Sequence, residues 1–118
     1  MANILRIGMD ESSIKPRRAL LERAGHTVSE ASDVRQLVAA CSGVHFDLII
    51  IGHKLPAMEK LRVSTLVEEH CPGTKILELH TAPTPDLDHV DAHLHINGDS
   101  PEDLFRYVER LTAKRESA

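Results

Sequence analysis

The chain has 118 residues, of which 42% are hydrophobic and 3% aromatic, and its formal net charge at pH 7 is −4. This length suits one ordinary domain and is too short for two, so we expect a single domain over residues 1–118 with an aliphatic core. The negative charge argues against a nucleic-acid-binding surface, which normally carries an excess of basic residues.

The sequence has no long apolar segment. The N-terminus contains no long apolar run of the kind found in a secretion signal. No other stretch approaches the roughly 18 apolar residues that suggest a membrane-spanning helix. We therefore expect a cytoplasmic protein that makes no membrane contact. Cys41 and Cys71 lack Cys-x-x-Cys spacing and fall where a helix favours an apolar residue or ends. This placement predicts buried, inert thiols and gives no sign of an oxidising compartment.

The first part of the chain alternates between strand and helix patterns. Ile4 to Met9 predicts a first strand, and a helix is expected from the following polar turn to about Ala24, with Gly25 as its C-cap. Thr27 to Ala31 predicts a second strand. Ser32 is expected to cap the next helix, which ends at Ser42-Gly43 and has apolar residues spaced i, i+3, i+4 and i+7: Val34, Leu37, Val38 and Cys41.

The clearest strand pattern in the sequence runs from Phe46 to Gly52. Its four consecutive aliphatic residues show no alternation, which is typical of a central parallel strand covered on both faces. A helix is expected from about Met58 to His70, stopping at Cys71-Pro72-Gly73, and a fourth strand from Thr74 to Leu79.

The last part of the chain departs from regular alternation. Pro83 and Pro85 exclude regular structure after the fourth strand, and Asp86 to Asp91 has room for only a turn or two of helix. Ala92 to Ile96 predicts a fifth strand. Ser100 followed by Pro101 is typical of a helix start, and the buried stripe of this last helix is expected to be Leu104, Val108 and Leu111.

Five strands alternating with helices predict an α/β fold, with one doubly wound parallel sheet and right-handed crossovers. In such sheets a functional site lies at the carboxyl ends of the strands, near the point where the strand order reverses. The residues expected there are Gly8, Met9, Asp10, Gly52, His53, Lys54, His80, Thr81 and Asn97.

Three segments, taken in order, resemble the receiver domains of bacterial two-component response regulators (CheY-like, flavodoxin-like). Phe46–Pro56 is similar to the third strand of that family and the Leu-Pro loop after it. Leu20–Val28 resembles its first helix and second strand, and Ser100–Leu104 resembles the start of its last helix. The resemblance spans essentially the whole chain. It implies the strand order 2-1-3-4-5 and a role in two-component signalling.

The resemblance also implies a phosphorylation pocket, which is degenerate here. Receivers use two acids after the first strand, a phosphoacceptor aspartate after the third, a hydroxyl after the fourth and a lysine after the fifth. Matched by motif, these positions fall at Gly8, Met9, Gly52, Thr81 and Asn97, and only Thr81 keeps the required group. We therefore expect a pseudo-receiver. The short interval from Thr81 to Asn97 predicts a truncated or missing fourth helix.

The function expected from this pattern is protein–protein interaction or dimerisation in a signalling pathway. The chain is not expected to be an enzyme or to need a cofactor. An alternative of a different class is a flavodoxin-like protein that holds a metal or small ligand at the strand ends. Its metal ligands would be Asp10, His53 and His80, because imidazoles and carboxylates are suitable ligands for Zn²⁺.

Alternation in the fourth and fifth strands places polar side chains on one face of the sheet. If the missing fourth helix leaves that face uncovered, these side chains form an exposed, pH-sensitive surface for self-association or partner docking. The alternative is that residues 86–91 fold over the face and the histidines make local hydrogen bonds. The residues concerned are Glu78, His80, His93 and His95.

Overall fold

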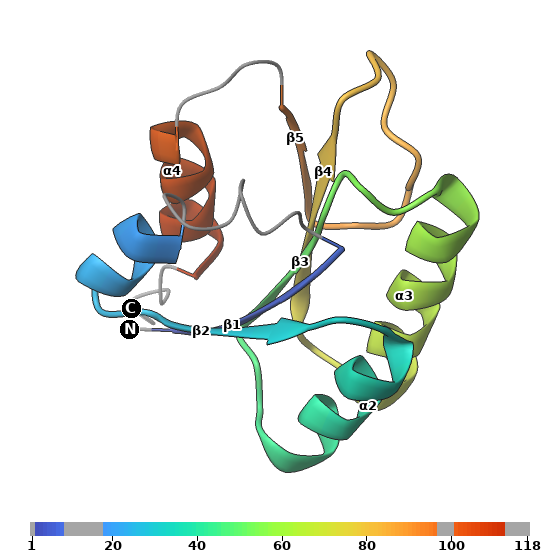
Figure 1. Ribbon diagram of the computed structural model, residues 1–118, viewed down its shortest axis with the longest axis horizontal. Coiled ribbons are helices and arrows are strands. Elements are labelled where there is room, and N and C mark those ends of the chain that lie inside the picture. Colours follow the sequence, from blue (N-terminus) through green and yellow to red (C-terminus); the bar gives the residue numbers. More distant parts are fainter. Residues whose placement is uncertain (1, 9–17, 97–100, 113–118) are drawn as a thin grey trace, which may run out of the picture.

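The computed structural model describes residues 2–8, 18–96 and 101–112 (Figure 1). Its centre is a parallel five-stranded sheet in the order β2-β1-β3-β4-β5. The predicted α/β class and the strand order 2-1-3-4-5 are therefore confirmed. The strands are β1 Asn3–Ile7, β2 Thr27–Ala31, β3 Leu48–Ile51, β4 Lys75–His80 and β5 Ala92–His95.

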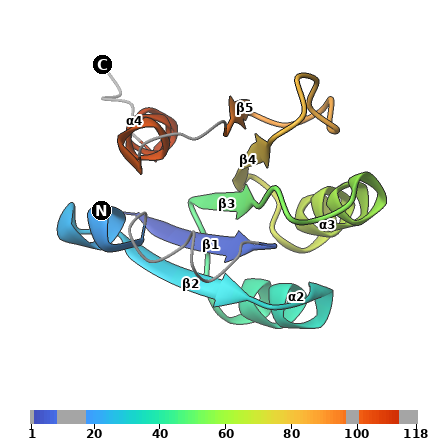
Figure 2. The ribbon, with the colours of Figure 1, turned by 45° about the horizontal axis from the view of Figure 1, so that its top comes forward.

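Helices cover both faces of the sheet, as parallel strands require. α2 (Val34–Gly43) and α3 (Ala57–His70) lie on one face. α4 (Pro101–Thr112) and the helical residues 18–23 lie on the other (Figures 1 and 2). Every residue of β3 is buried, which confirms its predicted place as a central strand.

The two faces of the sheet carry separate aliphatic cores, because successive side chains of each strand point in opposite directions. Together these cores hold the four helical segments of the described residues against the sheet. One contains Ile4, Leu48, Ile50, Leu77, Leu79, Leu104 and Val108. The other contains Leu5, Ile49, Ile51, Leu37, Val63 and Val67.

The start of α2 differs by one residue from the prediction. Asp33 is the N-cap, and its Oδ1 accepts a hydrogen bond of 2.9 Å from the amide of Gln36. Ser32 instead donates its backbone amide to Oε1 of Gln36, at 2.7 Å. Asp33 therefore takes the role predicted for Ser32, since both residue types cap helices well. Ser100, the predicted cap of α4, lies outside the described residues.

The connection from β4 to β5 contains no helix. Residues 81–91 form bends without regular structure, and they run along the side of the sheet that α3 covers (Figures 1 and 2). The predicted truncation of the fourth helix is confirmed. Leu87 is buried at 4% exposure and joins the core beneath α3, so this segment packs against the sheet.

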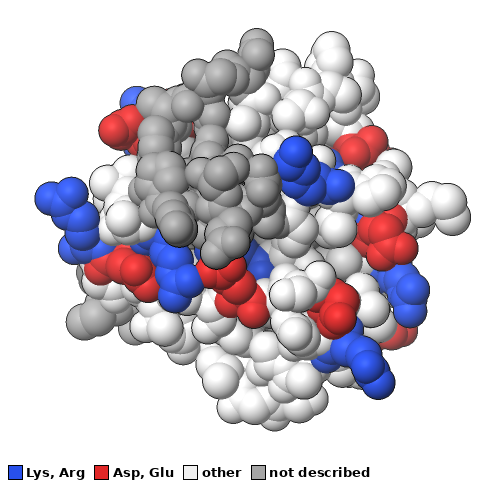
Figure 3. Space-filling view, viewed as in Figure 1, with Lys and Arg blue, Asp and Glu red and all other residues white. Residues whose placement is uncertain are grey.

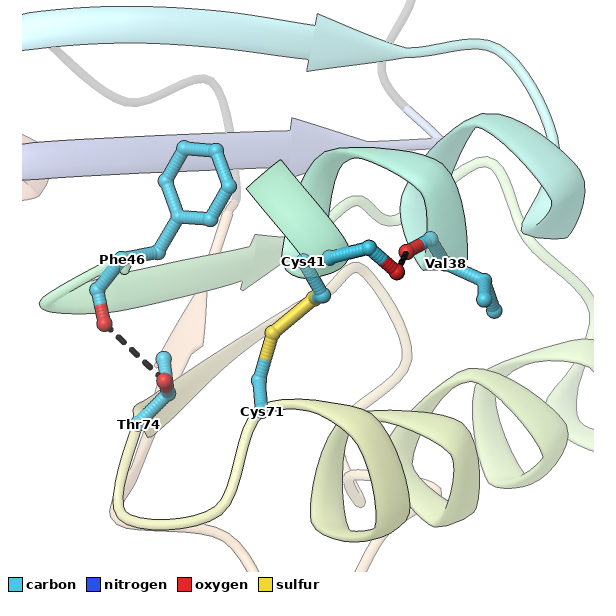
Figure 4. Close-up of a disulfide and its surroundings, with 6 residues drawn as sticks. Val38, Cys41, Phe46, Cys71 and Thr74 are labelled. Carbon is cyan, nitrogen blue, oxygen red and sulfur yellow. Dashed lines mark hydrogen bonds between the residues drawn. A yellow bond between two sulfur atoms is a disulfide. The ribbon is translucent and has the colours of Figure 1, made fainter. Parts of the chain in front are cut away.

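The two cysteines form a disulfide, so the prediction of free, inert thiols is wrong. Cys41 in the last turn of α2 is bonded to Cys71, the residue that follows α3 (Figure 4). Their Cα atoms are 5.7 Å apart although 30 residues separate them in sequence. The spacing of the cysteines in the sequence did not indicate that they pair. Packing of α2 against α3 brings the two positions together.

An ion pair between a buried arginine and an exposed glutamate joins the first two strands. Arg6 of β1 is 1% exposed, and its Nη2 lies 3.1 Å from Oε2 of Glu30, the residue paired with it in β2. Burial lowers the pKa of the Arg6 guanidinium, while the carboxylate of Glu30 opposes that shift. The pair therefore fixes a charged contact across the β1–β2 ladder.

The surface carries charges of both signs. Basic and acidic side chains alternate over the face in Figure 3, without a region of one sign alone. Within the described segments, no helix combines the length and apolar character that crossing a membrane demands. A cytoplasmic location stays a prediction.

Candidate functional site

The degenerate phosphorylation pocket lies where β1 and β3 end. These strands are neighbours, so Gly8 and Gly52, which follow them, stand next to each other. The amide of Gly52 donates to the carbonyl of Ile7 at 2.7 Å, and the amide of Lys54 donates to the carbonyl of Gly8 at 3.2 Å. The loop after β3 is thereby held against the end of β1.

Gly8 leaves no room for a side chain in the present arrangement. Its φ is +80°, a conformation that favours glycine. A Cβ atom at this position would lie 2.3 Å from Cγ of Leu55. Leu55 therefore fills the space in which an acid at position 8 would begin.

The other predicted pocket positions are only partly described. Thr81 follows β4 and is exposed, and its carbonyl accepts a hydrogen bond of 3.0 Å from Nε2 of His95. Met9 and Asn97 lie outside the described residues. Among the described positions of this pocket, none carries a carboxylate.

A buried ion pair lies beside this end of the sheet. Lys60 of α3 is 1% exposed and Glu78 of β4 is 0% exposed. Nζ of Lys60 donates to Oε2 of Glu78 and to the carbonyl of Leu79, both at 2.9 Å, and lies 3.1 Å from Oδ2 of Asp86. These partners compensate the charge of Lys60 within the protein.

Glu78 also anchors the segment that replaces the fourth helix. Its Oε2 accepts from the amide of Asp86 at 2.9 Å, and its Oε1 accepts from the amide of Leu87 at 3.2 Å. Nε2 of His93 lies 3.4 Å from the same Oε1. One buried carboxylate thus binds α3, the 86–87 backbone and β5 together.

The predicted exposed surface is wrong for Glu78 and His80, and the alternative of a folded-over segment with local hydrogen bonds describes the structure. His80 is 6% exposed, and its Nδ1 donates to the carbonyl of Ala82 at 2.7 Å. Nε2 of His93 donates to the carbonyl of Leu87, also at 2.7 Å. The rings of His80 and His95 stack with centroids 5.0 Å apart, and of this set only His95 is exposed. The segment of residues 81–87 covers this face, and its backbone carbonyls accept hydrogen bonds from the imidazoles.

Receiver domains are among the solved structures with a similar arrangement. The chemotaxis response regulator CheY4 of Vibrio cholerae is 25% identical, with a TM-score of 0.79 over 94% of this chain and 98% of CheY4. The chain has the receiver fold. A second similar structure is the receiver domain of a Pseudomonas aeruginosa sensor histidine kinase, solved with magnesium in its active-site cleft. It is 17% identical to this chain and has a TM-score of 0.79. The match covers 96% of this chain and 98% of that domain.

A third similar structure comes from a complex of histidine kinase ThkA with response regulator TrrA. It is 17% identical, with a TM-score of 0.76, and the match covers 96% of this chain and 100% of that one. No family model and no curated protein sequence matches this chain. The similarity to receivers therefore rests on three-dimensional structure and on the order of the motifs.

The alternative metal site at the strand ends gains no support within the described part of the chain. No group of three or more His, Cys, Asp or Glu side chains there is arranged to hold a metal ion. His53 and His80 belong to this part of the chain, whereas Asp10 lies outside it. The alternative ligand set of Asp10, His53 and His80 therefore stays a prediction.

Two residues that organise this region were missed in the sequence although each left a signal. Lys60 stands three residues before Val63 and seven before Val67, in the buried stripe of α3. Glu78 stands between Leu77 and Leu79 in a buried strand. A lysine and a glutamate, each at a position that favours an apolar residue, indicate a buried pair, since an isolated buried charge is costly.

Proposed function

We propose that this chain is a receiver-like signalling domain of two-component type that acts by binding a protein partner and does not form an aspartyl phosphate. Its fold is that of receivers, and the observation that carries the second half of the proposal is the contact of Leu55 with Gly8. An apolar side chain occupies the space where the side chain of an acid at position 8 would begin, and Gly52 offers no carboxylate to attack a phosphodonor.

Incubation of the protein with acetyl phosphate and Mg²⁺ is expected to leave its mass unchanged. Receivers accept phosphoryl groups on an aspartate held beside a metal ion, and neither Gly8 nor Gly52 supplies such a group. Intact mass spectrometry checks the result, with an aspartate-bearing receiver treated in parallel as the positive control. A stoichiometric, acid-labile gain of one phosphoryl group would contradict the proposal.

Gly52→Asp alone is also expected to remain unmodified under the same conditions. The new carboxylate would lack the acid pair that binds Mg²⁺, because position 8 is a glycine whose side-chain space is filled by Leu55 and position 9 is a methionine. The measurement is the same mass shift, with Gly43→Asp as a matched control for the added charge. Uptake of phosphate at the rate of an ordinary receiver would mean that Asp10 and Glu11 already hold the metal.

The partner class proposed for this chain is a protein of a signalling pathway. TrrA was solved together with the histidine kinase ThkA, which gives an example of a receiver partner. A second copy of this chain is the alternative partner. Sedimentation velocity over a range of protein concentrations distinguishes a monomer that needs a different protein from a chain that forms its own dimer.

The proposal includes neither an enzymatic activity nor a cofactor. The charges of mixed sign visible in Figure 3 and the overall negative charge give no support to nucleic-acid binding. A Zn²⁺ assay after dialysis of the purified protein tests the alternative function, and stoichiometric metal would favour it over the signalling role.

A further inference from the structure

The disulfide lies at the opposite end of the sheet from the degenerate pocket. Cys41 precedes β3 and Cys71 precedes β4, so both stand at the amino ends of strands. Gly8 and Gly52 instead follow their strands. In Figure 4 the bond joins the end of α2 to the end of α3. A chemical change at the disulfide would therefore act on a different part of the receiver fold from phosphorylation.

Both cysteines line a surface pocket of about 290 Å³. Its walls are formed by the turn after α2 and by the residues around the end of α3: Cys41, Ser42, Gly43, Val44, His45, Phe46, His70, Cys71 and Pro72. Cys41 is half-buried and Cys71 is 7% exposed. An external thiolate must contact sulfur directly to exchange with a disulfide, and a pocket lined by both cysteine residues is where it would approach.

The packing of α2 and α3 does not rest on the disulfide alone. Leu37 of α2 and Val63 and Val67 of α3 are each 1% exposed and share a core cluster with Ile49 of β3. Breaking the sulfur–sulfur bond leaves these apolar contacts in place, and contacts of this kind dominate the stability of a domain. The reduced protein is therefore expected to stay folded, which a reversible exchange requires.

We propose that Cys41–Cys71 is a site of reversible thiol–disulfide exchange with a small cysteine-based thiol such as glutathione. The thiolate of the small molecule attacks Sγ of Cys41, the more exposed of the two cysteine residues, and forms a mixed disulfide while the bond to Cys71 breaks. Cys71 leaves as a thiolate and takes a proton from water. A second thiol then cleaves the mixed disulfide, so that two small thiols are oxidised to one disulfide and both cysteines end as thiols.

Thiol–disulfide exchange at Cys41–Cys71 would give the proposed signalling domain a response to redox conditions. The exchange itself does not require that the signalling function be correct. Reduction removes the covalent link between the ends of α2 and α3, whereas the Gly8–Leu55 contact lies at the other end of the strands. A phosphorylation experiment can fail or succeed without changing the outcome at the cysteines. The two proposals are therefore tested separately.

The test follows reduction of the native full-length chain by glutathione near neutral pH, without denaturant. Samples are alkylated at intervals, and their intact mass reports disulfide, mixed disulfide and dithiol. Direct attack predicts that a tenfold increase in glutathione raises the rate of reduction by about tenfold. A rate independent of glutathione, or reduction only in denaturant, would show a closed structural disulfide and overturn the proposal.

Matched variants test the route through the pocket. Gly43 lines the pocket, and a Cβ there would meet no atom within 4 Å, so Gly43→Phe is expected to fold and to slow reduction several-fold. Ala39→Phe on the exposed side of α2 is the control, with the rate expected to stay that of the wild type. Equal rates in both variants and the wild type would exclude this route.

Single-cysteine variants compare how readily each cysteine exchanges with glutathione, whether or not the phenylalanine variants fold. In oxidised glutathione, Cys71→Ser leaves Cys41 and is expected to gain the mass of one glutathione faster than Cys41→Ser. The difference follows from the lower exposure of Cys71. Faster modification of Cys71 would overturn the assignment of Cys41 as the attacked sulfur.

Discussion

Lys60→Met is expected to lower the free energy of unfolding by about 3–5 kcal/mol, because it leaves a buried carboxylate without its cation. Glu78 is fully buried and bound by Nζ of Lys60 at 2.9 Å. Two backbone amides remain as its donors in the variant, but they carry no charge to balance it. Urea unfolding of the wild type and variant, followed by circular dichroism, measures the difference.

Two further variants make this experiment specific. Lys54→Met removes an exposed lysine and is expected to change stability by no more than about 0.5 kcal/mol. Lys60→Met combined with Glu78→Gln is expected to recover part of the loss, since a neutral amide no longer needs a cation. A Lys60→Met protein within about 1 kcal/mol of the wild type would show that the buried pair is not required for stability.

Gly8→Asp is expected to destabilise the protein by about 3 kcal/mol, even though it restores an acid that ordinary receivers carry. A residue with a side chain at φ +80° costs about 1–2 kcal/mol, and forcing its Cβ against Leu55 adds about 1–3 kcal/mol. The clash involves Cγ of Leu55 at 2.3 Å, so the Leu55 side chain or the loop that carries it must move. Denaturant unfolding gives the measurement.

A double-mutant cycle with Leu55→Ala separates the two costs. The clash disappears in the double variant while the backbone conformation stays unfavourable, so a coupling of about 1–2 kcal/mol between positions 8 and 55 is expected. Gly43→Asp, at a position where a Cβ meets nothing within 4 Å, is the control for the added charge. Additive effects of Gly8→Asp and Leu55→Ala would mean that Leu55 does not occupy the acid position.

Local patterns were sufficient to predict the elements of this fold. The uninterrupted aliphatic run of β3 indicated a buried central strand, and the two prolines after β4 indicated the loss of the fourth helix. Pro101 marked the first residue of α4. These signals depend on residues close in sequence, whose spacing alone determines which side chains share a face.

Part of the candidate site was also visible in the sequence. The Leu-Pro pair at positions 55 and 56 placed the end of the third strand, and Gly8 and Gly52 do follow neighbouring strands. The missing carboxylates are a property of the sequence itself. The position of Leu55 in the place of an acid could not be read from the sequence. It depends on how the loop after β3 folds back over β1.

The tertiary structure alone decided which distant side chains meet. Lys60 and Glu78 are 18 residues apart, and the two cysteines are 30 apart. Each of these four residues lies in a local pattern that fits an apolar residue or a helix end. The neighbouring sequence therefore does not indicate which residue it contacts. The packing of α3 against β4 and α2 brings them together, and the high cost of burying an unpaired charge makes the first of these pairings necessary. The sequence thus determined the strands, the helices and the absent acids, while packing determined the buried ion pair, the covered histidines and the disulfide.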